Sequence, residues 1–332
     1  MIKIDKIKSK KGHVRKLGLE YEYSDLPLDE TCKLIQNLFG GEINCINNSV
    51  YEVEGTELGT FKVELDALPV QKLSEQNKKI QTKSKQSLVE EFQVKAGAGV
   101  EEFSTFFTPF EIVTPPIEMT DLEQMKKLED ALREHNAAGT KSSFKYAFGL
   151  HLNPEVYDDS AQSIVAHLQS FLMLEPWLIK NHNIDFSRKL TSFIDPFPKK
   201  YIKHVLREDY QPNMDQLIDD YHAYNPTRNR SLDLTPLLCF INEEKVRNLY
   251  GEKEKINKRP TFHYRLPNCE IGQKGWSFKQ ELELWLKVEN LAHNQKCLKQ
   301  LMDLYQEHES SLFSLESKWV EKVEEFIKKH EI

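Results

Sequence analysis

The stretch Leu17-Gly18-Leu19-Glu20-Tyr21-Glu22-Tyr23 decides the fold prediction for this chain. Successive side chains of a β-strand point to opposite faces. An extended backbone therefore puts the apolar side chains on one face: Leu17, Leu19, Tyr21 and Tyr23. Gly18, Glu20 and Glu22 lie on the other face. The pattern predicts a strand that covers a hydrophobic core with one face and carries carboxylates on the other.

Two further segments repeat this division. In 61–67 the apolar side chains alternate with Lys62, Glu64 and Asp66, and in Phe110-Glu111-Ile112 the carboxylate of Glu111 points away from its neighbours. Strands in one sheet would bring five carboxylates to one surface. Two like charges about 4 Å apart repel by about 4 kcal/mol at an effective dielectric constant near 20. The cluster therefore predicts bound cations, and divalent ions that prefer oxygen ligands fit it best.

Each segment taken alone also fits a simpler interpretation. Antiparallel sheets often have one face on the core and the other in water, and outward glutamates are then ordinary. The site hypothesis depends on the coincidence of several such segments in one chain.

Two later segments add cationic and imidazole groups to the same pattern. In 144–153 a regular apolar face alternates with small and polar residues, among them Gly149, His151 and Asn153. Small residues in a strand indicate that another group approaches the backbone closely. In 261–266, His263 and Arg265 share the face opposite to the aromatic residues.

The order of these segments resembles the putative amidoligase family, which belongs to the glutamine synthetase and glutamate–cysteine ligase superfamily of carboxylate–amine ligases. The segments that carry the resemblance are Gly18–Glu22, Asp66–Leu68, Glu111–Pro116, Gly149–Asn153, Arg228–Leu234 and Thr261–Asn268. The sequence departs from the family pattern at three positions. Asn153 replaces the second histidine of a Gly-x-His-x-His strand, His263 replaces a glutamate and Leu68 replaces a serine.

The resemblance implies an α+β fold, with a curved antiparallel sheet of the glutamine synthetase and glutamate–cysteine ligase type and helices packed on its convex face. It also implies an ATP-dependent carboxylate–amine ligase that forms an amide bond through an acyl phosphate. The expected cofactors are ATP and Mg²⁺ or Mn²⁺, because carboxylate oxygens suit these ions. The expected substrates are small molecules, amino acids or peptides.

The resemblance assigns roles to residues of this sequence. The expected metal ligands are Glu20, Glu22, Glu64, Asp66 and Glu111. The expected cofactor-binding residues are His151, Asn153, Lys62 and Arg265, and the expected catalytic residues are Arg265, Arg228, Arg230 and His263. Because imidazole replaces a carboxylate at His263, we expect one metal position to be weakened or absent and His263 to contact a phosphate or a substrate carboxylate instead.

Other interpretations of these residues remain open. Arg265 can simply pair with a sheet carboxylate, and Arg228 and Arg230 can belong to a solvated loop, because ion-pair networks imitate functional clusters. A metal-dependent hydrolase would use the same carboxylates. A non-catalytic ligand-binding protein of the same fold is a third reading, favoured by the departures at Asn153 and His263.

The composition and net charge of the whole chain limit which classes of protein it can belong to. It has 332 residues, 39% of them hydrophobic, which is typical of a globular protein. A net charge of -7 argues against a nucleic-acid surface. Apolar runs stay below the roughly 18 residues that a membrane span needs. Five irregularly spaced cysteines form no CxxC zinc pattern, so we expect a reducing cytoplasm. The oligomeric state, both substrates and the general base stay open.

The predicted organisation is an N-terminal arm (1–15), an amidoligase-like catalytic domain (16–306) with a helical insertion at about 155–225, and a C-terminal helix (307–332). Gly40-Gly41 should end a first helix, and Thr120-Asp121-Leu122-Glu123 reads as a capping box that opens another. The glycines of 95–100 lack the GK[ST] ending of a P-loop and predict a plain connection. The expected helices are 29–39, 71–94, one that begins at this capping box, 279–306 and about 312–329, and 187–203 is expected to be a loop.

Overall fold

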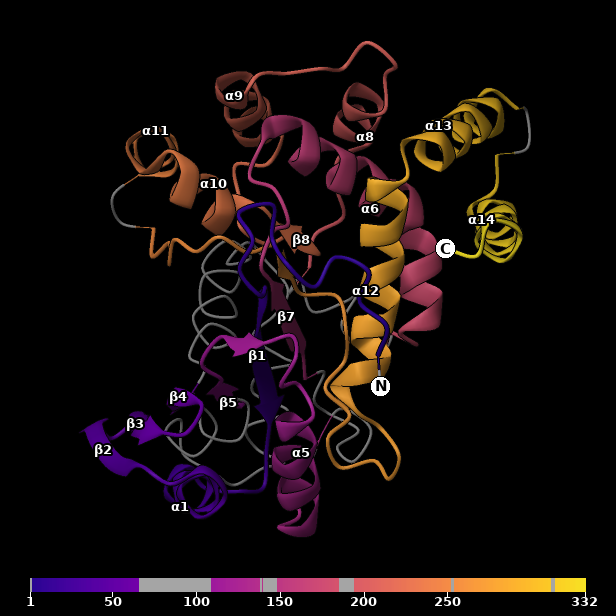
Figure 1. Cartoon of the computed structure of the whole chain (residues 1–332). Helices are drawn as coiled ribbons and strands as arrows, with labels where there is room; N and C mark the ends of the chain where they lie inside the picture. The colour runs from indigo at the N-terminus through magenta and orange to yellow at the C-terminus, as the bar shows by residue number, and fades with distance from the viewer. Residues whose placement is uncertain are drawn as a thin grey trace, which may run out of the picture.

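The computed structural model describes residues 2–65, 109–137, 139, 148–184, 194–251, 254–311 and 314–332. Within these residues the chain forms one open antiparallel sheet with helices around it (Figure 1), which confirms the α+β prediction. The strands are β1 (Lys16–Tyr23), β2 (Glu42–Asn47), β3 (Val50–Thr56), β4 (Gly59–Leu65), β5 (Phe110–Val113), β6 (Ile117–Glu118), β7 (Leu150–Pro154), β8 (Leu232–Asp233) and β9 (His263–Tyr264).

The opening strand lies at the centre of the sheet. The strand order is β2-β3-β4-β5-β1-β7-β9-β8, and β6 also pairs with β1. Register places Glu22 of β1 opposite Glu111 of β5, and Glu111 in turn opposite Glu64 of β4. On the other side of β1, Glu20 lies opposite His151 of β7. The acidic side chains therefore form one continuous polar face, as the alternation predicted.

The opposite face of the sheet is the core. Leu17, Leu19, Tyr21 and Tyr23 are all fully buried. Ten helices are described: α1 (Leu28–Phe39), α5 (Gln124–Glu134), α6 (Ala161–Asn181), α8 (Lys199–Val205), α9 (Met214–Tyr224), α10 (Thr235–Ile241), α11 (Glu243–Tyr250), α12 (Phe278–His293), α13 (Gln295–Ser310) and α14 (Glu316–His330). Helix α1 packs on β2, β3 and β4, and α6 packs along α12 (Figure 1).

Aromatic side chains fix these helices to the core face. The ring of Tyr264 on β9 lies 5.8 Å from that of Phe171 on α6 and 5.0 Å from that of Trp285 on α12, measured between centroids. The hydroxyl of Tyr21 donates to Glu129 on α5. Burial of such large apolar groups is the main force that holds the sheet in place.

The helix predictions are confirmed in part. Helix α1 ends as predicted at Gly40, which adopts a φ of 73° that favours glycine. The capping-box prediction is wrong: α5 begins one turn later, its N-cap is Glu123, and no side chain caps it. The predicted helix 279–306 is two helices, because the side chain of Asn294 accepts the Cys297 N–H and starts α13 there.

Other expectations are shortened or fall outside the described residues. The last strand is only His263–Tyr264, and the predicted loop 187–203 contains the first turns of α8 from Lys199 onward. Asp66, the helix 71–94 and the loop 95–100 lie outside the described residues. The described part of the N-terminal arm is attached to the domain. Lys10 donates to Asp158 at 2.7 Å, and the buried Arg15 binds Glu289 through two hydrogen bonds of 2.9 and 2.6 Å.

Among the described residues, none of the helices combines the length and the apolar character needed to cross a membrane.

Candidate active site

Glu20 is the centre of the polar face. Its Oε2 lies 2.7 Å from Nδ1 of His151. Its Oε1 accepts a hydrogen bond from Asn153 and forms an ion pair with Arg259, both at 3.0 Å. The residue is only 8% exposed. Burial raises the pKa of Glu20, but Arg259, His151 and His263 outweigh burial and hold this pKa well below its usual range. Glu20 is therefore an ionised carboxylate, and each of its two oxygens already contacts a neighbouring side chain.

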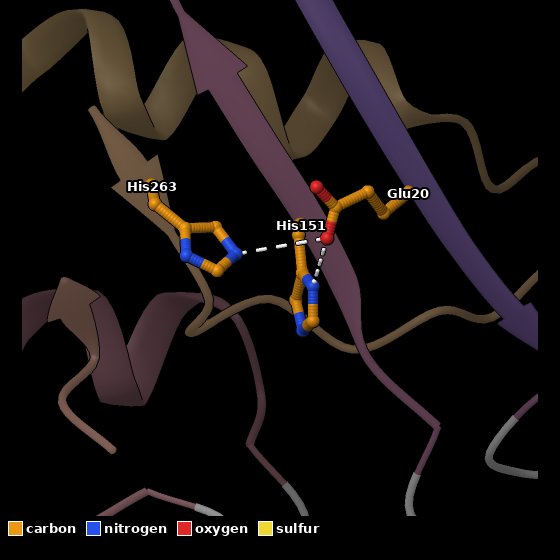
Figure 2. Close-up of side chains that lie close together, drawn as sticks. All are labelled: Glu20, His151 and His263. Atoms are coloured by element: carbon orange, nitrogen blue, oxygen red, sulfur yellow. Dashed lines mark hydrogen bonds and ion pairs between the residues drawn. The ribbon is translucent and has the colours of Figure 1, made fainter. Parts of the chain in front are cut away.

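His263 stands beside Glu20 without a hydrogen bond. Its Nε2 is 3.6 Å from Glu20 Oε2, and its Nδ1 is 3.5 Å from Oδ2 of Asp233. Neither ring nitrogen has a hydrogen-bond partner among the described residues, even though the residue is buried, with only 7% of its surface exposed. Figure 2 shows the rings of His151 and His263 each directing a nitrogen at the same carboxylate oxygen. Buried polar groups are nearly always hydrogen-bonded, so this arrangement calls for a physical reason.

A second group lies along the acidic row that Glu22, Glu111 and Glu64 form across three strands. Glu22 Oε2 accepts the N–H of Gly149 at 2.5 Å, and its Oε1 is 3.7 Å from His151 Nε2. Potential ligand atoms of Glu22, Glu111 and His151 lie within 4.8 Å of one another, as do those of Glu20, His151 and His263. His151 thus belongs to both groups.

The charge states of the polar face suit cation binding. Burial lowers the pKa of His151, against the opposing effect of Glu20 and Glu22, and nearby Arg265 lowers it further. A neutral imidazole is the form that binds metal. Glu64 is partly neutralised, because Lys62 Nζ lies 2.7 Å from its carboxylate. Both residues therefore lie on the polar face as predicted, but they are bound to each other.

The three predicted arginines occupy different surroundings. Arg265 follows His263 on the same face and donates to the backbone oxygen of Arg228 at 3.2 Å. Arg228 donates to Asp233 at 3.3 Å, which connects it to His263. Arg230 is buried, and its guanidinium donates to Asn225 and to the Pro196 carbonyl. Arg265 and Arg228 thus adjoin the Glu20 cluster, whereas the contacts of Arg230 fasten chain segments together.

Two residues of the cluster, Arg259 and Asp233, were not predicted from the sequence. Arg259 forms the ion pair with Glu20, and it could have been found by extending the alternation of Thr261, His263 and Arg265 back by one step. Asp233 is fully buried. Burial raises its pKa, but His263 and Arg228 outweigh burial and lower this pKa to about 2. Its pairing with His263 depends on β8 lying beside β9, which periodicity does not reveal.

A cavity of about 380 Å³ opens at the end of the polar face next to Glu20. Gly18 and Asn153 face each other across β1 and β7 in its lining. Asn153 turns its Nδ2 to Glu20, and its buried Oδ1 has no hydrogen-bond partner in the described part of the chain. The other lining residues are His13, Lys16, Leu19, Val113, Thr114, Pro116, Glu155, Arg259, Pro260 and Thr261.

The residues on the polar face fit bound cations. Carboxylate oxygens and neutral imidazole nitrogens are the usual ligands of divalent ions in proteins. Two features support this fit: the nitrogens of the buried His263, which make no hydrogen bond in the described part of the chain, and the carboxylates aligned by strand register.

Comparison with known proteins gives the family. Neither a search of curated proteins nor a search of solved structures finds a match for this chain. A family model described as putative amidoligase enzyme matches residues 13–287, which include every described residue of the polar face. The match covers most of the sequence and confirms the resemblance, and the chain therefore belongs to the putative amidoligase family of ligase-type enzymes.

Proposed function

We propose that this protein is an ATP-dependent carboxylate–amine ligase that uses Mg²⁺ or Mn²⁺ and an acyl-phosphate intermediate. The observation that carries the proposal is the meeting of Glu20, Glu22 and Glu111 with His151 on the polar face, beside Arg265, in a chain of this family. Activation of a carboxylate by ATP needs both kinds of group, because phosphoryl transfer develops negative charge that cations must neutralise.

The cavity beside Gly18 supports a nucleotide at one end of this face. Val113, Pro116 and Pro260 offer apolar walls for a planar base, and the unpartnered Oδ1 of Asn153 can accept an N–H from it. Gly18 leaves the floor of the cavity without a side chain. Four residues of strand, about 14 Å at 3.4 Å per residue, separate Gly18 from Glu22. Phosphates that leave the cavity would pass Arg259 and Glu20 before reaching the acidic row.

The chemistry divides among the residues as follows. An oxygen of the substrate carboxylate attacks the γ-phosphorus, the bond to the bridging oxygen breaks, and ADP leaves. The amine nitrogen then attacks the acyl carbon, loses a proton, and phosphate departs. Divalent ions, when bound, neutralise charge on the phosphate oxygens. Glu20, Glu22 and Glu111 would hold the ions, and the planar guanidinium of Arg265 would orient the transferred phosphoryl group.

A metal-dependent hydrolase is the second candidate. It is favoured by the set of Glu20, His151 and His263, because three protein ligands leave a coordination position open for water. ADP release that requires both a carboxylate and an amine separates the ligase from the hydrolase.

Calorimetric titration of the protein with Mg²⁺–ATP tests the proposal. We expect Glu20→Gln and Glu22→Gln each to weaken binding, because each removes a negative charge from the polar face while retaining side-chain volume. Glu118→Gln on β6 is the matched control, since Glu118 is exposed at the strand end. Unchanged Mg²⁺–ATP affinity in the double variant, with the fold intact by circular dichroism, would remove the acidic strand from the site.

A further inference from the structure

The surroundings of His263 differ from those of an ordinary buried histidine. The ring lies between two carboxylates, at 3.6 Å from Glu20 and 3.5 Å from Asp233, yet forms no hydrogen bond with either. A buried polar group without partners costs about 1–3 kcal/mol. Sheet pairing with β7 and β8 fixes the backbone of β9, so the ring stays where its nitrogens face these two carboxylates. A ligand bound between Glu20 and His263 would satisfy the ring.

The distances match the separation of ligands around a small metal ion. Zinc-type ions hold nitrogen and oxygen at about 2.0–2.2 Å, which puts neighbouring ligands of a tetrahedral site about 3.4 Å apart. His263 Nε2 and Glu20 Oε2 are 3.6 Å apart, close to that value. His151 Nδ1 is nearer, at 2.7 Å from the same oxygen, and a small ring shift would open this contact. Arg259 and Asn153 occupy the other oxygen of Glu20, which leaves Oε2 directed at the two rings (Figure 2).

The types of ligand decide which ion fits. Imidazole suits zinc, iron, cobalt, nickel and copper, whereas magnesium prefers carboxylates and water. The charge of Glu20 is already balanced by Arg259, so this group attracts a hard ion less strongly than the acidic row of Glu22 and Glu111 does. Two imidazoles, in contrast, supply the nitrogen donors that transition metals bind.

Asp233 completes the arrangement behind His263. Its carboxylate faces Nδ1 of the ring, which leaves Nε2 for the ion. Arg228 donates to Oδ2 of Asp233, and the Thr235 N–H donates to Oδ1. Metal-binding histidines usually donate their second N–H to a carboxylate of this kind, which fixes the ring and its tautomer.

We propose that Glu20, His151 and His263 form a site for a transition-metal ion of the zinc or cobalt type, distinct in metal preference from the acidic row, with Asp233 as the positioning residue of His263. The proposal assigns His263 Nε2 to a metal instead of to a phosphate. It rests on the proposed function only in treating the polar face as the site that binds cations. A fourth coordination position would be available to water or a phosphate oxygen.

Titration with Co²⁺ followed by its visible absorption tests the proposal without ATP. Millimolar Mg²⁺ is present throughout to occupy the acidic row. We expect the parent protein to bind one Co²⁺ with the intense bands of a low-coordinate, nitrogen-ligated ion, and Zn²⁺ to displace it. Asp233→Asn should weaken Co²⁺ binding about 10–100-fold, the usual cost of losing a partner behind a ligand. Asparagine retains the oxygen that accepts the Thr235 N–H, so the start of α10 is preserved.

His263→Glu is the decisive variant. It should lower the affinity for Co²⁺ at least as much as Asp233→Asn does and raise the affinity for Mg²⁺. His135→Gln is the control, because His135 is exposed at the end of α5 and should leave both affinities unchanged.

Two results would overturn the proposal: Mg²⁺ displacing Co²⁺ from the parent, or His263→Glu binding Co²⁺ as tightly as the parent with its circular dichroism unchanged. Cobalt binding as expected in a protein that fails to bind Mg²⁺–ATP would instead refute the ligase proposal and leave the metal site standing.

Discussion

Replacing Glu129 by glutamine should stabilise the protein, by an amount that grows as pH rises from about 4.5 to 7. Glu129 is 1% exposed under β1, where it accepts the N–H of Phe278 at 2.8 Å and the hydroxyl of Tyr21. Burial raises its pKa to about 7, and these hydrogen bonds oppose the rise only in part. The folded state therefore favours the protonated carboxyl, so above pH 7 it must hold a buried charge.

The magnitude follows from linkage between protonation and folding. A carboxyl whose pKa rises from 4.5 to about 7 on folding makes stability fall as pH increases through this range, by about 3 kcal/mol in total. Below pH 4.5 the carboxyl is protonated in both states and contributes no pH dependence. Glutamine is neutral throughout and retains an oxygen for the Phe278 N–H. The variant should match the parent near pH 4.5 and exceed its stability by about 3 kcal/mol above pH 7.

Urea unfolding of parent and variant across this range measures the difference. The pH dependence of the parent's unfolding free energy does not by itself test the role of Glu129, because a second buried group also titrates. Burial lowers the pKa of His167 from 6.5 to about 4. A histidine kept neutral in this way adds stability as pH rises from about 4 to 6.5 and offsets the effect of Glu129. Subtracting the two curves removes His167. A difference in stability that does not change with pH would refute the assignment of a protonated Glu129.

Three more outcomes are expected. Arg265→Lys should keep the fold and lower ligase turnover by about 100–1000-fold, equivalent to about 2.7–4 kcal/mol, because lysine cannot donate in two directions within a plane; parental ADP release would exclude Arg265 from catalysis. Gly18→Val should weaken ATP binding in calorimetry by filling the cavity floor; equal ATP affinity would place the nucleotide elsewhere. Arg15→Met should destabilise the fold by about 3–5 kcal/mol in urea, because Glu289 keeps a buried charge, and adding Glu289→Leu should restore most of the loss.

The face to which each strand side chain points could be predicted from the sequence. Alternation in 17–23 requires only that one face be buried, and Glu20 and Glu22 lie on the predicted face. The alignment of Glu22 with Glu111 and Glu64 was expected only as a convergence on one surface, because strand register depends on pairing between distant segments.

Residues outside the clear strand pattern were harder to predict. Arg259 precedes the two-residue strand β9, so only an extension of the alternation beyond the strand itself reveals it. The second helix boundary at Asn294 was missed because the apolar spacing continues through it, and only the bond from Asn294 to the Cys297 N–H ends one helix and starts the next. The capping box at Thr120 failed because the backbone of 119–123 makes turns before α5 begins.

A screen for ADP formation is the most direct test of the central claim that the polar face joins a carboxylate to an amine. The protein is incubated with Mg²⁺–ATP and a panel of amino acids and peptides, alone and in pairs, and the products are identified by mass. We predict ADP only when a carboxylate and an amine are both present, in equal amount with a product whose mass is the sum of both substrates less one water. ADP or hydrolysis products formed without any condensed product would contradict the claim.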